Sequence, residues 1–478
     1  MTFNNLKKID KHHIFLILLI LFAAILLPST SPIGFHDVKC MTNDYFNFAK
    51  SMIQGDRLYV DLFDHKGIVL FLLYYIPVLI SDTSLIGVFL LESLISAGIT
   101  TTCYGYLRNK NKCSKTASLI ITSVTVIILK LIFSQTMLNT EPICILIAFL
   151  LLRYIDNKEY EKYKKTDYIL FGLAFVLLFW MKYPMVIVLF PFWLYICIQS
   201  VRGGKTTLFI KRCFISFITV VTMSVPIMWY FLHNNIVEEM FCSYFASLNN
   251  MEWVFIGSML EISIALIFVI AIIGMIMTGK TDKTKMFFAI SFICVFFLSN
   301  IGGVRAYTAS PIIVLLPMYL PDVWKGKYVR PIAVGLLALI ILLYMPKGLH
   351  NNSSKIEELA EKYNITNDNI LYLCEDLGFG TYFPDGYREK GQWLPGRITY
   401  NDNEEFCKRT MKWIEEKEFQ YICVTGIDFD AEISNEEYAT NNYAQIIKAT
   451  QDNYEIVESF IYNESVPVKY YVLQTKEN

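Results

Sequence analysis

The chain has 478 residues, of which 54% are hydrophobic and 15% aromatic, and its mean hydropathy is +0.42. Repeated apolar runs about as long as a bilayer is thick exclude a soluble protein and predict a polytopic membrane protein. The formal net charge of −1 provides no global basic field, so we expect no nucleic-acid partner.

A basic segment precedes the first apolar run. Lys7, Lys8 and Lys11 stand before residues 14–27, as they would in a signal peptide. No small-residue cleavage pattern follows this run, and many more apolar segments come later. We therefore expect a retained first helix with its basic end in the cytoplasm.

A charged stretch from Asp37 to Lys66 follows the first helix, within an expected first external loop at 31–66. Residues 41–53 carry apolar and polar positions at helical spacing, which predicts a helix lying along the membrane surface. The triplet Asp64-His65-Lys66 then brings charge to the start of the next apolar segment. We expect the chemistry of the protein to lie in this stretch.

Hydropathy predicts further membrane segments, for a total of about 11 to 13 transmembrane helices. The segments lie at 67–81, 84–107, 115–133, 137–154, 167–181, 184–200, 208–232, 255–277, 286–301, 308–320 and 331–345.

The distribution of Lys and Arg predicts the orientation of these segments. Basic loops at 157–165, 202–212, 280–285 and 325–330 are expected in the cytoplasm, which places Glu141, Lys182 and Arg305 outside. The basic cluster 108–115 conflicts with this order if both preceding segments cross the membrane. Segment 67–81 is short for a span of about 20 residues, and we favour a half-length segment there.

The chain changes character after residue 346. The expected organisation is a transmembrane domain at 1–346 and a small extracytoplasmic α/β domain at 347–478, because strand and helix patterns alternate in the polar tail. Strands are predicted at 370–374, 421–424, 456–462 and 469–473, and helices at 356–363, 404–417 and 443–452.

The cysteines predict neither a metal site nor a disulfide framework. Most of the eleven lie inside apolar runs, where cysteine behaves as a small hydrophobic residue. The polar tail holds Cys374, Cys407 and Cys423, an odd number without zinc-ligand spacing, which leaves open one pair among the three.

The first external loop carries Gly55, Tyr59, Asp61, Phe63 and Asp64-His65-Lys66-Gly67 in this order. This motif resembles the opening of the GT-C glycosyltransferases. The nearer relatives are the dolichyl-phosphate-mannose-protein mannosyltransferase-like proteins of glycosyltransferase family 39 type. Weaker similarity of arrangement extends over most of the chain, through Glu141, Lys182-Tyr183-Pro184 and Pro395-Gly396-Arg397.

The resemblance implies transfer of a hexose-type sugar from a polyprenyl-phosphate donor on the outer face of the cell membrane. The implied acceptor is a lipid-linked or envelope glycan, and no nucleotide or organic cofactor is expected. Participation of a divalent cation, and hence any metal ligand, stays open. In such enzymes an acidic residue of the first external loop acts as the base on the acceptor hydroxyl, and basic residues hold the departing lipid phosphate.

The chain departs from this pattern at the expected base. Alignment through Tyr45 and Ala49 places the acid's usual position on Met41, whose thioether cannot take a proton. The nearest carboxylates, Asp37 and Asp44, lie about one helical turn away on either side. The candidate catalytic residues are therefore Asp44 and Asp37, with Glu141 as a second carboxylate; the alternative is that these are solvated loop acids or helix caps.

The candidate residues for binding the substrate phosphate are basic or stand beside a basic residue. Lys66 is expected on the external side at the start of an apolar helix, whereas basic residues usually collect in cytoplasmic loops. Its ordinary alternative role is to anchor the helix at the lipid headgroups. Glu92, in the middle of an apolar segment, is expected to face the bundle interior in a structural hydrogen bond. The phosphate-binding candidates are Lys66, His65, Asp64, Lys182 and Arg305.

Two other functional classes remain open. A transporter or flippase of lipid-linked glycans would be expected to show repeated halves and charges at mid-membrane, whereas this chain shows no repeat and gathers its charges at one face. Met41 keeps open a non-catalytic GT-C-like protein that binds lipid-linked glycans in envelope biogenesis.

Overall fold

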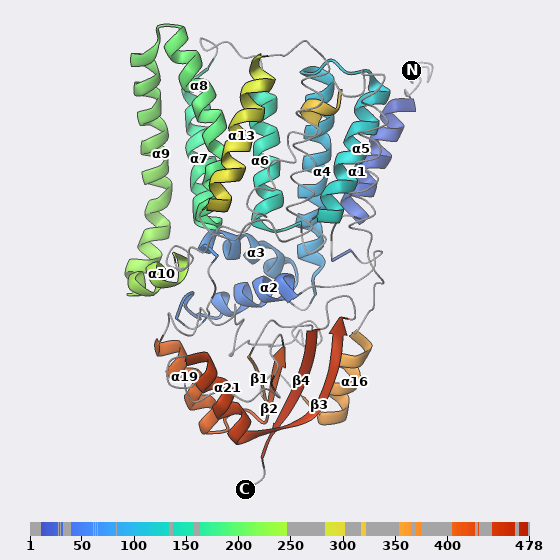
Figure 1. Ribbon diagram of the computed structural model, residues 1–478, viewed down its shortest axis with the longest axis vertical. Helices are drawn as coiled ribbons and strands as arrows, with labels where there is room; N and C mark the ends of the chain where they lie inside the picture. Colours follow the sequence, from blue (N-terminus) through green and yellow to red (C-terminus); the bar gives the residue numbers. More distant parts are fainter. Residues whose placement is uncertain are drawn as a thin grey trace, which may run out of the picture. The chain divides into compact units, whose positions relative to one another are not determined.

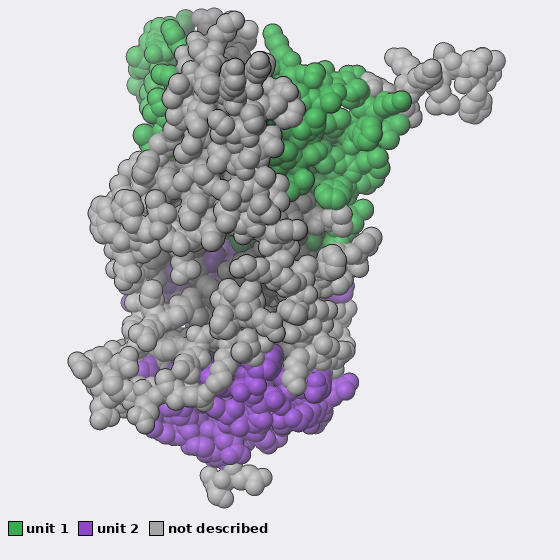
Figure 2. Space-filling model, turned by 45° about the vertical axis from the view of Figure 1, so that its right-hand side comes forward, with its two compact units in different colours: residues 1–34, 89–226, 250–345 green, residues 35–88, 227–249, 346–478 purple. Residues whose placement is uncertain are grey.

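The computed structural model describes more than half of the chain, in segments separated by gaps. Contacts divide the chain into two compact units, residues 1–34, 89–226 and 250–345 and residues 35–88, 227–249 and 346–478 (Figure 2). The described residues are 11–26, 40–60, 66–82, 84–132, 137–155, 163–245, 283–301, 317–321, 353–365, 369–373, 404–425, 442–463 and 468–476, with single positions at 28, 30, 31, 62, 64 and 429.

The first unit is a bundle of apolar helices (Figure 1). Its boundary with the second unit falls inside α4 (Ile86–Asn109) and α9 (Thr206–His233). The predicted helices are confirmed to within three residues at each end, except that predicted segment 184–200 begins with a 3₁₀ turn. Predicted segments 255–277 and 331–345, and most of 308–320, lie outside the described residues. The elements are α1 (Lys11–Leu26), α4 (Ile86–Asn109), α5 (Lys115–Ile132), α6 (Thr140–Ile155), α7 (Lys165–Met181), η2 (Tyr183–Leu189), α8 (Phe190–Arg202), α9 (Thr206–His233) and α13 (Lys283–Ile301).

Three stretches within the described residues are helices long and apolar enough to cross a membrane: Ile86–Asn109, Tyr183–Arg202 and Thr206–His233. By contrast, α3 (Ile68–Ile80) has 13 residues. At 1.5 Å per residue its length is about 20 Å, against a hydrocarbon core of about 30 Å. The prediction of a short segment after the first external loop is confirmed.

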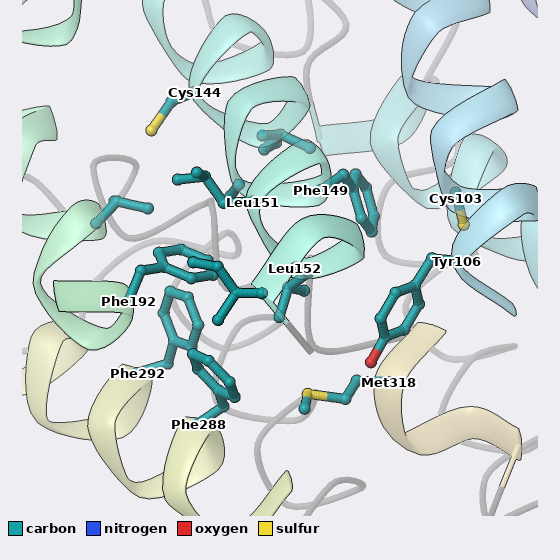
Figure 3. Close-up of a cluster of buried hydrophobic side chains, with 14 of the residues drawn as sticks. Cys103, Tyr106, Cys144, Phe149, Leu151, Leu152, Phe192, Phe288, Phe292 and Met318 are labelled. Carbon is teal, nitrogen blue, oxygen red and sulfur yellow. The ribbon is translucent and has the colours of Figure 1, made fainter. Parts of the chain in front are cut away.

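Aromatic side chains fill the centre of the first unit. Figure 3 shows the rings of Phe192, Phe288 and Phe292 gathered beside α6, which contributes Phe149 and Leu152. The ring centroids of Phe192 and Phe288 lie 5.4 Å apart. Because lipid tails are as apolar as these side chains, such close packing rather than the hydrophobic effect holds helices together inside a membrane.

Helices α7 and α9 approach each other closely at Gly172. A Cβ atom built on Gly172 would lie 2.8 Å from Thr219 Cβ and 2.9 Å from the carbonyl oxygen of Ser216. The Ser216 hydroxyl donates to the carbonyl of Tyr168, at 2.5 Å. A small residue in one helix therefore allows backbone contact with the other, as is typical of membrane bundles.

The second unit contains the helix predicted in the first external loop, α2 (Cys40–Ile53), together with α3 and α10 (Val237–Tyr244). The ring of Tyr45 packs edge-on against Phe71 and Tyr74, with centroid distances of 5.9 and 5.6 Å. Phe48 stacks on Phe71 at 5.5 Å. The predicted apolar side of α2 is therefore covered by α3. The spacing of apolar residues in the sequence does not show whether a helix packs on protein or on lipid.

The C-terminal part of the second unit is a four-stranded mixed sheet with helices on both faces (Figure 1). The strand order is β1-β2-β4-β3; β1 and β2 are parallel, and β4 is antiparallel to both β2 and β3. All four predicted strands and all three predicted helices are confirmed. They are α16 (Ser353–Tyr363), β1 (Ile370–Tyr372), α19 (Glu404–Glu415), β2 (Tyr421–Thr425), α21 (Asn442–Asn453), β3 (Tyr454–Asn463) and β4 (Val468–Thr475).

Alternation along β2 explains how the sheet is buried on both sides. Ile422 and Val424 belong to a core that includes residues of α19 and α21, whereas Tyr421 and Cys423 belong to a core that includes residues of α16. The period of two residues in a strand separates these two sets. The apolar run 421–424 in β2 fits such a three-layer arrangement.

Candidate active site

Backbone hydrogen bonds join the described residues between Arg57 and Leu62 in a tight turn. Tyr59 N donates to the carbonyl of Leu62 at 2.6 Å, and Leu62 N donates to the carbonyl of Arg57 at 3.2 Å. Tyr59 has φ +73°, in the left-handed region, which costs a residue with a Cβ about 1–2 kcal/mol. A bulky residue keeps such a conformation only where its surroundings fix it.

The side chain of Tyr59 supplies that fixation. It is 1% exposed and stacks on Phe231 with a centroid distance of 5.9 Å. Its hydroxyl donates to the carbonyl of Lys66 at 2.7 Å. Burial raises the pKa of Tyr59 well above its ordinary value, and Tyr244 and Asp64 raise it further, so the phenol remains a donor.

Lys66 stands immediately before the Gly67 cap of α3 and is only 4% exposed. Its backbone N–H donates to Asp64 Oδ1 at 2.8 Å, and its Nζ lies 3.7 Å from the same oxygen. Nζ also lies 6.0 Å from the centroid of the Tyr45 ring. Together with the Tyr59 bond, these contacts hold Lys66 through its N–H, its carbonyl and its ammonium group.

A second buried ion pair lies in the first unit. Lys182 Nζ is 2.9 Å from Glu141 Oε1, and the two residues are 6% and 5% exposed. Glu141 is in the first turn of α6 and Lys182 is the C-cap of α7, so each charge lies at the helix end that favours it. The sequence indicated these residues separately, and the structure brings them into direct contact.

The remaining candidates are described only in part or not at all. Asp44 is the fifth residue of α2, with its backbone in the helix. Asp37, His65 and Arg305 lie outside the described residues. In the parts of the chain that the structure describes, no three His, Cys, Asp or Glu side chains are grouped to hold a metal ion.

Glu92 is fully buried and joins three segments of the first unit. Its Oε2 accepts hydrogen bonds from Thr30 Oγ1 at 2.6 Å and from Thr30 N at 3.3 Å, and its Oε1 accepts one from Met137 N at 2.7 Å. The predicted structural hydrogen bonding is confirmed. Because Met137 lies four residues before Glu141, Glu92 fixes the entry to the helix that carries Glu141.

Sequence reasoning missed the burial of the polar side of α2. Asn47, Lys50 and Ser51 are 2%, 5% and 1% exposed. Lys50 Nζ donates to the carbonyl of Asp82, just beyond the end of α3, at 2.8 Å. An amphipathic pattern shows where polar residues gather, but it does not show whether other parts of the chain cover them.

Comparison with known proteins gives structural similarity alone. No protein-family model matches the sequence, and no curated protein sequence matches it. The apo oligosaccharyltransferase of Archaeoglobus fulgidus is similar with TM-score 0.49 and 11% identity, over 96% of this chain and 74% of that chain. The form of that enzyme tethered to an acceptor peptide gives TM-score 0.48 and 11% identity, over 98% and 74%. The arabinofuranosyltransferase AftD from Mycobacteria gives TM-score 0.43 and 10% identity, over 98% and 40%.

Proposed function

We propose that this chain is an integral-membrane glycosyltransferase that moves a hexose-type sugar from a polyprenyl-phosphate donor to a lipid-linked or envelope glycan. The reaction takes place on the outer face of the cell membrane, where the first external loop and the C-terminal α/β domain lie. The observation that carries the proposal is the fixation of Lys66, a buried lysine in the loop motif, through three of its groups.

Lys66 serves the departing phosphate. As the bond between the sugar C1 and the phosphate oxygen breaks, negative charge grows on the lipid phosphate. A fixed ammonium group shielded from water stabilises that charge more than a solvated one does. The first N–H groups of α3 lie beside Lys66 in the chain and add partial positive charge.

An aspartate serves the acceptor. The acceptor hydroxyl oxygen forms the new bond to C1, and its proton passes to the carboxylate of Asp44 or Asp37. Polyprenyl phosphate leaves with the electron pair of the broken bond. The donor is already activated as a glycosyl phosphate, so the transfer needs no organic cofactor.

The Glu141 and Lys182 pair has a separate role. A carboxylate in a 2.9 Å hydrogen bond with an ammonium group is stabilised in its ionised form and is a weak proton acceptor. We assign Glu141 to holding the ammonium group of Lys182 in place.

The test is a transfer assay in membranes with radiolabelled polyprenyl-phosphate hexoses. Wild type is compared with Asp44→Asn, Asp37→Asn and the double variant. A general base contributes about 10² to 10⁴ in rate, so one of the single variants loses at least about a hundredfold. Full transfer by the double variant contradicts the base assignment. Wild-type protein that binds these lipids without transferring sugar supports the non-catalytic alternative.

A further inference from the structure

Helix α2 carries buried polar side chains as well as the aromatic residues that pack on α3. At 100° per residue, positions 44, 47 and 51 lie within about 60° of one another around the helix. Position 48 is next to them and position 45 is about 100° or more away; both of these residues pack on α3. Asn47 and Ser51, on the side of position 44, are 2% and 1% exposed. The helix is therefore buried on its polar side as well as on its apolar side.

The two polar groups on this side have unused hydrogen-bonding capacity. Asn47 Nδ2 and Ser51 Oγ are both buried without a hydrogen-bond partner. An unpaired buried polar group is costly, and folded proteins keep few of them, commonly at functional sites. Two such groups one helical turn apart on the same side of a helix point to a ligand that supplies their hydrogen bonds.

This side of α2 is held in place before any ligand binds. Lys50, between the two residues in the chain, donates to the carbonyl of Asp82 at 2.8 Å, which ties α2 to the region beyond the end of α3. Tyr45 and Phe48, on the neighbouring part of the helix surface, hold α2 through their ring contacts with α3. Polar groups on a rigid helix bind a ligand without a further ordering cost.

The chemistry of the groups selects the ligand class. A carboxamide N–H₂ donates, and a hydroxyl both donates and accepts, which matches neutral hydroxyl groups on a ligand. An anionic phosphate would instead be expected to recruit lysine or arginine. Position 44, which carries the candidate base, lies on the same side of the helix, so a bound hydroxyl-bearing ligand would lie on the side of that position.

We propose that Asn47 and Ser51 bind the hydroxyl groups of a sugar ring, either the hexose of the donor or the sugar of the acceptor. This inference rests on the proposed glycosyl transfer and deepens it, because it assigns two residues to the recognition of the sugar. Both sources present the same chemistry, and they are separated by the ligands used in the test.

Thr42 provides a matched control. Its hydroxyl is also buried without a hydrogen-bond partner, but its position on α2 is on the opposite side from Asn47 and Ser51. Thr42→Val therefore removes a group of the same kind, in the same helix, outside the proposed site.

The experiment measures ligand binding to the full chain in lipid nanodiscs. The probes are polyprenyl-phosphate glucose, mannose and galactose, polyprenyl phosphate without a sugar, and the three methyl hexosides as acceptor mimics. Asn47→Ala and Ser51→Ala each weaken binding of a sugar-bearing probe about threefold to tenfold, as expected for one hydrogen bond. Binding of bare polyprenyl phosphate stays unchanged, and so does every affinity of Thr42→Val.

The arms of the experiment separate the two sources of the sugar. A loss confined to the polyprenyl-phosphate hexoses identifies the donor sugar, and a loss confined to the methyl hexosides identifies the acceptor sugar. The proposal is overturned if neither variant weakens any sugar-bearing probe, or if Thr42→Val weakens it equally. The proposal is likewise overturned if the polyprenyl-phosphate hexoses bind no better than bare polyprenyl phosphate and the methyl hexosides do not bind at all.

The failure of this inference differs from the failure of the proposed function. Sugar binding that depends on Asn47 and Ser51, in a protein that transfers no sugar, supports the site and contradicts the enzyme. Normal transfer with unchanged sugar binding in both variants supports the enzyme and contradicts the site.

Discussion

Glu141 Oε1 and Lys182 Nζ lie 2.9 Å apart, and the pair joins the start of α6 to the end of α7 in a buried environment. Removal of one partner leaves an uncompensated charge, whereas removal of both leaves none. The pair is therefore expected to respond very differently to single and double substitution.

Glu141→Gln and Lys182→Met are each predicted to lower the free energy of unfolding by about 3–5 kcal/mol, the range for breaking a buried pair. The double variant is predicted to recover most of this loss. Thermal unfolding in detergent, arranged as a double-mutant cycle, measures the coupling. Additive losses in the double variant would contradict a direct ion pair.

Gly172→Ala is predicted to destabilise the helical bundle by about 1–3 kcal/mol, because overpacking forces backbone shifts. The new Cβ would meet Thr219 Cβ at 2.8 Å and a backbone oxygen at 2.9 Å. Gly98→Ala is the control, since its Cβ would meet only side-chain atoms of Leu146, at 3.4 Å or more. Equal melting temperatures for the two variants would contradict the close approach of α7 and α9.

Ser51→Ala is predicted to stabilise the ligand-free protein by about 1 kcal/mol, because it removes a buried hydroxyl without a hydrogen-bond partner. Thr42→Val is predicted to act in the same direction for the same reason. The two variants differ in sugar binding, which only Ser51→Ala weakens. Chemical unfolding of both variants without ligand tests this, and a loss of stability in Ser51→Ala would show that its hydroxyl is satisfied.

Tyr454→Phe tests the C-terminal domain at alkaline pH. The Tyr454 hydroxyl donates to the carbonyl of Phe419 at 2.8 Å, and burial raises the pKa of Tyr454 above its ordinary value of 10.0. Because the pKa of Tyr454 is higher in the folded state than in the unfolded state, its protonated hydroxyl stabilises the fold fully below about pH 10. This contribution is lost as the pH rises above that value. The stability difference between wild type and Tyr454→Phe is therefore predicted to shrink from pH 8 to pH 11, as measured by pulse proteolysis of the full chain in urea. A difference that stays constant over this interval would contradict the prediction.

Helices and strands were predicted correctly where a single clear pattern of apolar residues marks them in the sequence. Apolar length predicted the helices of the first unit, and short apolar runs in the polar tail predicted β2 and β3, because burial alone decides those elements. The apolar side of α2 was also predicted correctly. Its covering by α3 was not, because a pattern of apolar residues describes the surface of a helix and not what packs against it.

The candidate site was less predictable, since its contacts join residues far apart in sequence. The motif indicated Lys66, but the left-handed backbone of Tyr59 and its bond to the Lys66 carbonyl depend on the folded loop. Glu141 and Lys182 are 41 residues apart, and nothing in their spacing indicates a 2.9 Å contact. The unpaired groups of Asn47 and Ser51 follow from the covering of α2 and have no sequence signal of their own.

The most direct test of the account is sugar transfer by variants of the Asp64 and Lys66 pair. Lys66→Met alone removes the ammonium group beside the buried Asp64 carboxylate, so the neutral double variant Asp64→Asn with Lys66→Met serves to keep the loop folded. Lys66→Arg keeps the positive charge. Transfer from a radiolabelled polyprenyl-phosphate hexose is predicted to fall about a hundredfold or more in the double variant at unchanged thermal stability, and to be partly retained in Lys66→Arg. Wild-type transfer by the folded double variant would contradict the assignment of Lys66 to the departing phosphate.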